Sequence, residues 1–113
     1  GASAVWVSNH GGRQLDQSAA TADCLAEVVA EVGDEAEVYV DGGVRNARHA
    51  LAALALGARA VFLGRPVLYA LALDGEKGVH QLLTELAEDL EADLRVAGCS
   101  SVSAVPPDLV RRT

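Results

Sequence analysis

Three glycine-containing turns in this sequence carry the side chains best suited to chemistry, at residues 8–16, 41–45 and 64–66. Each turn contains an arginine, whose planar guanidinium binds a carboxylate or a phosphate through parallel hydrogen bonds. The glycines let the backbone approach a ligand closely, and free N–H groups near the start of a helix favour anions. The first turn also contains His10, whose imidazole can take up or release a proton near neutral pH. These residue types predict an anion-binding site.

A short apolar run precedes each turn and predicts a buried β-strand. The runs cover residues 3–7, 37–40 and 59–63. They are rich in β-branched or aromatic residues and almost continuously hydrophobic, which is typical of parallel strands covered on both faces. In parallel α/β folds, binding sites form at the carboxyl ends of the strands. The three turns are therefore expected to meet at one edge of a parallel sheet.

Helical patterns separate the expected strands, at residues 21–32, 47–56, 66–73 and 76–97. Thr21 is placed to cap the first helix, and Gly33 stands where a C′ glycine would end it. In the longest helix, the apolar residues from Val79 to Leu94 form one stripe, which predicts a buried face, and Trp6 is expected in the core. The alternating order predicts an α/β fold with right-handed crossovers.

Composition and charge indicate which partners and which cellular compartment are compatible with the chain. The chain has 113 residues, the size of one small domain, and its net charge of −7 argues against nucleic acid or an anionic membrane as the main partner. No stretch approaches the roughly 18 apolar residues of a membrane span, and no secretory signal is visible. Cys24 and Cys99 lack metal-ligand spacing and are interpreted as free thiols, which favours a reducing cytoplasm.

The motifs in these turns resemble those of the FMN-dependent α-hydroxy-acid oxidases and dehydrogenases, a family that includes glycolate oxidase, lactate oxidase and mandelate dehydrogenase. The run S-N-H-G-G-R-Q at residues 8–14 is similar to the active-site signature of that family. The runs D-G-G-V-R, A-L-A-L-G-A and G-R-P, at residues 41–45, 53–58 and 64–66, follow in the family's order and spacing. The resemblance extends from about Gly1 to Leu109.

The resemblance implies a TIM (β/α)8 barrel, of which residues 1–113 would be the C-terminal segment with the last three βα units. A complete barrel takes roughly 250 residues, so a partial barrel is expected. A lysine near the flavin, an aspartate that orients the catalytic histidine and the substrate-binding tyrosines would come from upstream and have no match here. A segment with open strand edges is expected to form a homo-oligomer or to associate with the missing part of the barrel.

The resemblance also implies FMN as cofactor and the oxidation of a small L-2-hydroxy acid to the 2-oxo acid. His10 would be the general base and contact the substrate, and Arg13 would pair with the substrate carboxylate. Ser8 would contact the flavin ring, and Asp41 would accept hydrogen bonds from the ribityl hydroxyls. The remaining cofactor-binding residues, around the ribityl phosphate, would be Gly42, Gly43, Val44, Arg45, Gly64 and Arg65.

Each role has a plainer alternative. His10 could be a loop histidine bonded to backbone, and Arg13 could form a surface ion pair with Asp16. Asp41 could simply cap its own turn, and Arg65 could be an ordinary helix-start residue. The whole chain could be a non-catalytic α/β fragment that self-associates, or part of another FMN-binding barrel such as a flavin-dependent isomerase.

The sequence departs from the family pattern after the second turn. Residues 46–52 read N-A-R-H-A-L-A, where the family usually has a glycine, an aspartate-containing helix start and then a lysine. We expect this difference to alter surface contacts and to leave the site intact. His49 and His80, both on expected helices, are interpreted as solvated.

Overall fold

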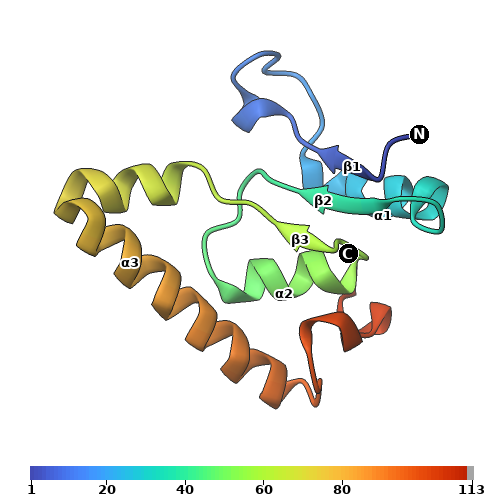
Figure 1. Ribbon diagram of the computed structural model, residues 1–113. Helices are drawn as coiled ribbons and strands as arrows, with labels where there is room; N and C mark the ends of the chain where they lie inside the picture. Colours follow the sequence, from blue (N-terminus) through green and yellow to red (C-terminus); the bar gives the residue numbers. More distant parts are fainter. Residues whose placement is uncertain (112–113) are drawn as a thin grey trace.

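The computed structural model describes residues 1–111 and contains one parallel sheet of three strands in the order β1-β2-β3 (Figure 1). The strands are β1 (Ala4–Val7), β2 (Glu37–Val40) and β3 (Ala60–Val61). The register places Val5 beside Val38 and Tyr39 beside Ala60. The predicted alternation of strands and helices is therefore confirmed.

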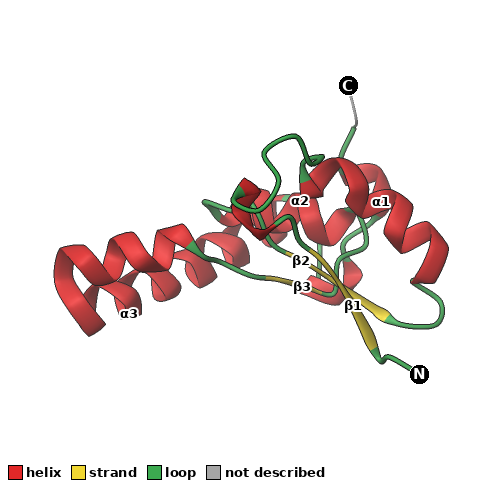
Figure 2. Ribbon diagram, turned by 90° about the horizontal axis from the view of Figure 1, so that it is seen from above, coloured by secondary structure: helices red, strands yellow, loops and turns green. Residues whose placement is uncertain are grey.

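Two helices cover one face of the sheet. Helix α1 (Thr21–Val32) lies between β1 and β2 in the chain, and α2 (Ala47–Ala55) lies between β2 and β3. Figure 2 shows both helices on the same side of the strands. The core lies between these layers and is built from small and aliphatic side chains, namely Leu25, Val38, Val40, Ala53 and Ala58.

Helix α3 (Arg65–Val96) runs away from the sheet, turns back at a kink and packs its distal part against α2 (Figure 1). The kink lies at Asp74 and Gly75, where Gly75 has a φ of 57°, a left-handed conformation that glycine adopts without steric cost. The two helices expected at residues 66–73 and 76–97 are thus joined around this break. Two short 3-10 turns, η2 (Val102–Ala104) and η3 (Pro107–Leu109), follow and contact α2.

Several expectations about burial and capping are wrong. Trp6 is 52% exposed because it lies on the sheet face that α1 and α2 leave uncovered. In the stripe of α3 only Leu94 is fully buried, and Leu83 is exposed. Thr21 does not cap α1, since Ala20 stands at the N-cap. Gly33 ends that helix as expected, but as its C-cap with a right-handed φ of −62°, not in the left-handed conformation of a C′ glycine. The third strand is shorter than residues 59–63 because only Ala60 and Val61 pair with β2.

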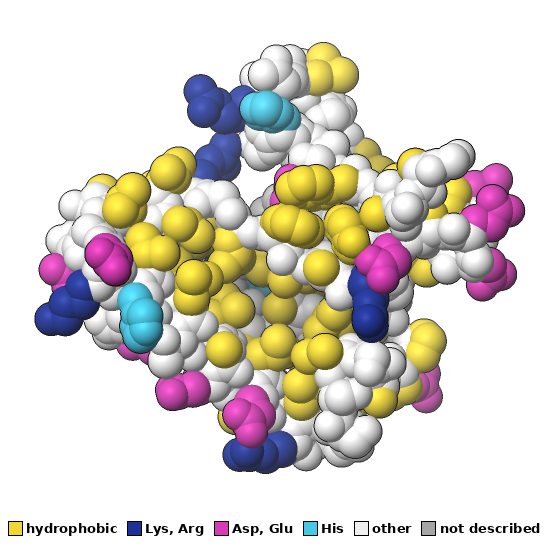
Figure 3. Space-filling model, in the orientation of Figure 1, with side chains coloured by type: hydrophobic (Ala, Val, Ile, Leu, Met, Phe, Trp, Pro, Cys, Tyr) yellow, Lys and Arg dark blue, Asp and Glu magenta, His cyan; other side chains and the backbone are white. Residues whose placement is uncertain are grey.

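The uncovered face of the sheet continues into an apolar surface. Figure 3 shows hydrophobic side chains spread between α3 and the strands, with charged side chains mostly around them. The bare face carries Trp6, Tyr39 and Phe62, with ring centroids 4.1 Å apart for Trp6–Phe62 and 5.8 Å apart for Tyr39–Phe62. Because side chains alternate along a strand, these three residues point away from the core valines.

Cys24 and Cys99 are free thiols, as predicted, and both are half-buried. Among residues 1–111, no helix is both long and apolar enough to cross a membrane. Within the same range, no group of three or more His, Cys, Asp or Glu side chains is arranged to hold a metal ion.

Candidate functional site

The carboxyl ends of the three strands open into one hollow of about 370 Å³. This volume lies within the range of small-molecule sites. The hollow is lined by all of the residues that the sequence assigned to a site: Ser8, His10, Arg13, Asp41, Gly42, Gly43, Val44, Arg45, Gly64 and Arg65. The structure therefore brings together side chains that the sequence distributes over three separate turns.

His10 sits in a tight 3-10 turn, His10–Gly12, directly after β1. Its φ of 56° lies in the left-handed region, which histidine enters more readily than most residues, and Gly11 and Gly12 follow with φ of 66° and 75°. The backbone N–H of His10 donates to Ser8 Oγ at 3.2 Å. Among residues 1–111 no group hydrogen-bonds to the imidazole, so the alternative of a ring tied to the backbone is not supported.

Arg13 follows the same turn and lines the same hollow as His10. Within residues 1–111 the ion pairs join Arg59 to Glu37 and Arg95 to Glu91, and neither involves Arg13. The surface pair with Asp16, which the sequence left open, is therefore absent from the described part of the chain. A guanidinium at the edge of a hollow is well suited to a carboxylate ligand.

Asp41 follows β2 and carries a half-satisfied carboxylate. Its Oδ2 accepts a hydrogen bond from Ser8 Oγ at 2.8 Å, which ties the turns after β1 and β2 together. Its Oδ1 is buried and has no hydrogen-bond partner within residues 1–111. Because an unpaired buried acceptor costs about 1 to 3 kcal/mol, a ligand hydroxyl at this atom would be favourable.

Thr21 is a site residue that sequence reasoning missed. It is 5% exposed, and its Oγ1 donates to the backbone carbonyl of Asp41 at 2.5 Å. A Cβ on Gly42 would lie 2.8 Å from the same Oγ1. The sequence pattern assigned Thr21 to helix capping because a threonine before an apolar periodic run usually does this, and no local signal distinguishes a long-range acceptor.

Arg45 and Arg65 bring positive charge to the hollow from the turns after β2 and β3. Arg65 Nη2 donates to the carbonyl oxygen of Gly11 at 2.7 Å and so reaches the turn that holds His10. The backbone N–H of Arg45 donates to His49 Nδ1 at 3.2 Å, so the interpretation of His49 as merely solvated is incomplete. Arg45, His49 and Arg65 also line an adjoining hollow of about 510 Å³ between α1 and α2.

Trp6 and Phe62 also line the hollow with His10, although the sequence pattern assigned Trp6 to the core. The alternation of side chains along the strand could have predicted the orientation of Trp6. Val5 stands beside the buried Val38, so Trp6 must face the opposite side of the sheet. The hollow thus has an apolar aromatic side next to its polar rim.

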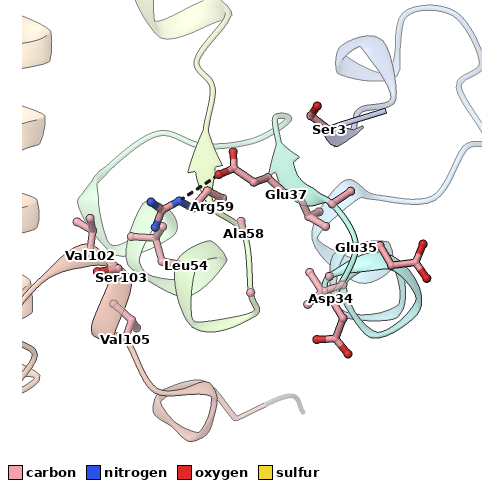
Figure 4. A pocket seen from close by; sticks show the side chains of 15 residues that line it. Ser3, Asp34, Glu35, Glu37, Leu54, Ala58, Arg59, Val102, Ser103 and Val105 are labelled. Carbon is pink, nitrogen blue, oxygen red and sulfur yellow. Dashed lines mark ion pairs between the residues drawn. The ribbon is translucent and has the colours of Figure 1, made fainter. Parts of the chain in front are cut away.

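The opposite end of the sheet has a different character. A hollow of about 630 Å³ lies there, and Glu37 and Arg59 in its lining form an ion pair at 3.7 Å. Figure 4 shows these side chains with the ion pair dashed. The Tyr39 hydroxyl donates to Glu37 Oε2 at 2.6 Å, and this hydrogen bond to a carboxylate raises the pKa of the Tyr39 phenol. None of the residues assigned to chemistry lies at this end.

Comparison with known proteins places the chain in one family. A family model described as FMN-dependent dehydrogenase matches residues 1–112. 2-Hydroxyacid oxidase 2 from Mus musculus is 53% identical over 107 residues, which cover 95% of this chain and 30% of the relative. Glycolate oxidase 3 from Oryza sativa subsp. indica is 50% identical over 105 residues, which cover 93% of this chain and 29% of the relative.

Solved structures agree with the sequence comparison. Mandelate oxidase with benzoyl-formic acid superimposes with a TM-score of 0.91 at 50% identity, over 95% of this chain and 32% of the other. An oxidised active mutant of (S)-mandelate dehydrogenase superimposes with a TM-score of 0.93 at 43% identity, over 100% of this chain and 31% of the other. The chain is therefore an α/β segment that spans about 30% of the length of the relatives it matches.

Proposed function

The chain belongs to the family of FMN-dependent dehydrogenases, and from this premise we propose that it forms the base-bearing and flavin-phosphate part of an enzyme that oxidises a small L-2-hydroxy acid to the 2-oxo acid. In this proposal residues 1–113 supply the last three βα units of a TIM barrel. The observation that carries the proposal is the shared hollow: His10 and Arg13 border the same space as Asp41 and the two arginines of the later turns.

The residues of the hollow fit a phosphorylated flavin. The buried Oδ1 of Asp41 lacks a donor, and a ribityl hydroxyl would provide one. A Cβ built on Gly43 or Gly64 meets nothing within 4 Å, so both backbones are open to close approach by a ligand. The guanidinium groups of Arg45 and Arg65 match the charge and geometry of a phosphate.

The chemistry divides between the cofactor and the side chains. Bound FMN supplies the acceptor for the two electrons that leave the substrate. Arg13 pairs with the substrate carboxylate and thereby fixes the α-carbon. His10 acts as a general base and removes a proton from the α-carbon or the hydroxyl. No group among residues 1–111 hydrogen-bonds to the His10 imidazole, which leaves one ring nitrogen for the substrate and one for an orienting partner supplied from outside this segment.

A second candidate is a non-catalytic α/β fragment that associates through its exposed face. The chain spans only about 30% of its relatives' length, and the described residues provide no orienting partner for His10. This candidate retains the site residues and lacks turnover. Both candidates expect the isolated chain to bind FMN without reduction by a hydroxy acid, so the full-length protein decides between them.

The test uses Trp6, which is the single tryptophan of the chain and borders the hollow. Titration with FMN should quench Trp6 emission in a saturable manner, since a flavin in the hollow lies close to the indole. Glycolate, L-lactate or mandelate is then added without oxygen, and the visible flavin band is followed. We expect the isolated chain to bind FMN without bleaching, and a full-length protein with these residues to bleach.

Free tryptophan titrated with FMN controls for absorption of the emitted light by the flavin. Quenching of Trp6 no greater than this control would contradict the proposed site. Absence of bleaching by the full-length protein with every hydroxy acid tested would contradict the proposed reaction.

A further inference from the structure

We propose that Thr21 is a positioning residue for flavin binding, which acts through Asp41 and fixes the direction of the free carboxylate oxygen. The proposal rests on the proposed function, because Asp41 Oδ1 is taken to accept a hydrogen bond from the ribityl chain. Thr21 belongs to neither the sequence motifs nor the rim of the 370 Å³ hollow.

Thr21 and Ser8 hold Asp41 at two different points. Thr21 Oγ1 donates to the backbone carbonyl of Asp41 at 2.5 Å, and Ser8 Oγ donates to the side-chain Oδ2 at 2.8 Å. The backbone N–H of Asp41 in turn donates to the carbonyl of Val7 at 3.2 Å. With carbonyl, amide and one carboxylate oxygen engaged, the remaining oxygen, Oδ1, has a defined direction and is the one polar atom of Asp41 without a partner among residues 1–111.

The hydrogen bond from Thr21 to the Asp41 carbonyl also connects two walls of the site. Thr21 is the first residue of α1, and the segment before it leads back to the turn that holds His10. Asn9 Nδ2 donates to the carbonyl of Ala19 at 3.3 Å, which ties that segment to the His10 turn. The hydroxyl of Thr21 therefore joins the wall that carries the proposed base to the wall that carries Asp41.

The fit around Thr21 is tight. Thr21 is 5% exposed, and its Oγ1 would lie 2.8 Å from a Cβ at Gly42, where φ is 92°. Thr21 also lines the adjoining hollow of about 510 Å³, so its hydroxyl lies between Asp41 and that space. Loss of the hydroxyl therefore leaves the Asp41 carbonyl without its buried donor and allows the turn to move.

The experiment compares Thr21→Val, which keeps the shape and removes the hydroxyl, with Thr21→Ser, which keeps the hydroxyl. Thr84→Val, at an exposed position of α3, is the matched control for the same chemical change. Affinities for FMN and for riboflavin are measured by Trp6 quenching. We expect Thr21→Val to weaken both ligands by the same factor, roughly threefold to tenfold, because the ribityl chain is common to both. Thr21→Ser should restore most of the affinity, and Thr84→Val should match the parent.

A second measurement needs no flavin. Amide hydrogen exchange at Gly42 and Gly43 should be faster in Thr21→Val than in the parent, while exchange in the middle of α1 stays unchanged. Equal flavin affinities in Thr21→Val and the parent would overturn the proposal, as would equal exchange rates at these glycines. A parent chain that binds no flavin would instead contradict the proposed function, and the exchange rates would still decide the role of Thr21.

Discussion

Two side chains of the site each carry a hydrogen-bonding group without a partner in the described residues. Asp41 has a buried oxygen without a donor, and His10 has a ring without a partner among residues 1–111. The unpaired buried oxygen of Asp41 costs free energy in the fold of these residues, whereas the His10 ring is exposed to solvent. Their convergence on one hollow gives the family assignment a physical basis in this chain.

Arg65 is expected to distinguish FMN from riboflavin. Replacing it with alanine removes a guanidinium from the proposed phosphate site, and it also removes the donor to the Gly11 carbonyl. We expect Arg65→Ala to weaken FMN binding by roughly tenfold to a hundredfold, the range of a charge-assisted hydrogen bond of about 1.5 to 3 kcal/mol, while riboflavin binding changes little. Trp6 quenching by each ligand measures the two affinities.

Arg95 provides the matched control for Arg65. It is a surface arginine at the far end of α3, where it pairs with Glu91. Arg95→Ala should leave both affinities unchanged. An equal loss of FMN and riboflavin binding in Arg65→Ala would show that Arg65 supports the His10 turn alone and would contradict its phosphate role.

At the residue scale, the sequence predicted which side chains meet and missed how they are held. His10, Arg13 and Arg65 were predictable because each follows a strand of one parallel sheet, and parallel strands end at the same edge. Thr21 was not predictable because its acceptor, the Asp41 carbonyl, lies 20 residues away in the sequence. Trp6 was misassigned because an apolar residue in a strand was taken for core although the opposite face of the sheet is bare.

At the scale of elements, the bounds of a helix or strand were predicted accurately where the local sequence determines them. Helix α1 and strand β2 have the predicted bounds, Thr21–Val32 and Glu37–Val40, because their apolar patterns are strong and flanked by polar turns. Strand β3 is shorter than predicted and covers only Ala60–Val61, the two residues that pair with Tyr39 and Val40 at the end of β2. Residues 65–96 were predicted as two helices separated at residues 74–75. The structure has a kink at these two residues, so the position of the predicted break is confirmed.

The turn after β2 offers a prediction about strain. Gly42 and Gly43 both have left-handed backbones, with φ of 92° and 78°. A Cβ at Gly42 would meet Thr21 Oγ1 at 2.8 Å, whereas a Cβ at Gly43 would meet nothing within 4 Å. We expect each alanine substitution to cost about 1 to 3 kcal/mol of unfolding free energy for the backbone conformation, with Gly42→Ala the more destabilising of the two.

Urea denaturation followed by circular dichroism measures the two free energies of unfolding. Gly43→Ala serves as the internal control, because it introduces the same methyl group and the same kind of backbone strain without the contact. The excess cost of Gly42→Ala then reports the steric contact with Thr21. Equal destabilisation by the two substitutions would contradict the packing of Thr21 against this turn.

At the scale of the whole molecule, the chain exposes surface that a folded domain normally covers. Helices α1 and α2 protect one face of the sheet, and the other face presents Trp6 at 52% and Phe62 at 37% exposure. The outer edges of β1 and β3 have no strand partner among residues 1–111. An apolar face next to unpaired strand edges favours association, whether with the rest of a barrel or with a second copy.

We therefore expect the isolated chain to self-associate at micromolar concentration, and Trp6→Lys to reduce this association. A lysine in place of Trp6 puts a charge in the middle of the bare face, and burying it against a second copy is costly. Val96→Lys is the control, because Val96 is 90% exposed at the far end of α3. Size-exclusion chromatography with light scattering should give a parent mass above that of the monomer, a lower mass for Trp6→Lys and an unchanged mass for Val96→Lys. A parent that elutes as a monodisperse monomer with a sharp thermal transition would show that the bare face is tolerated in water, and the expectation of association would be wrong.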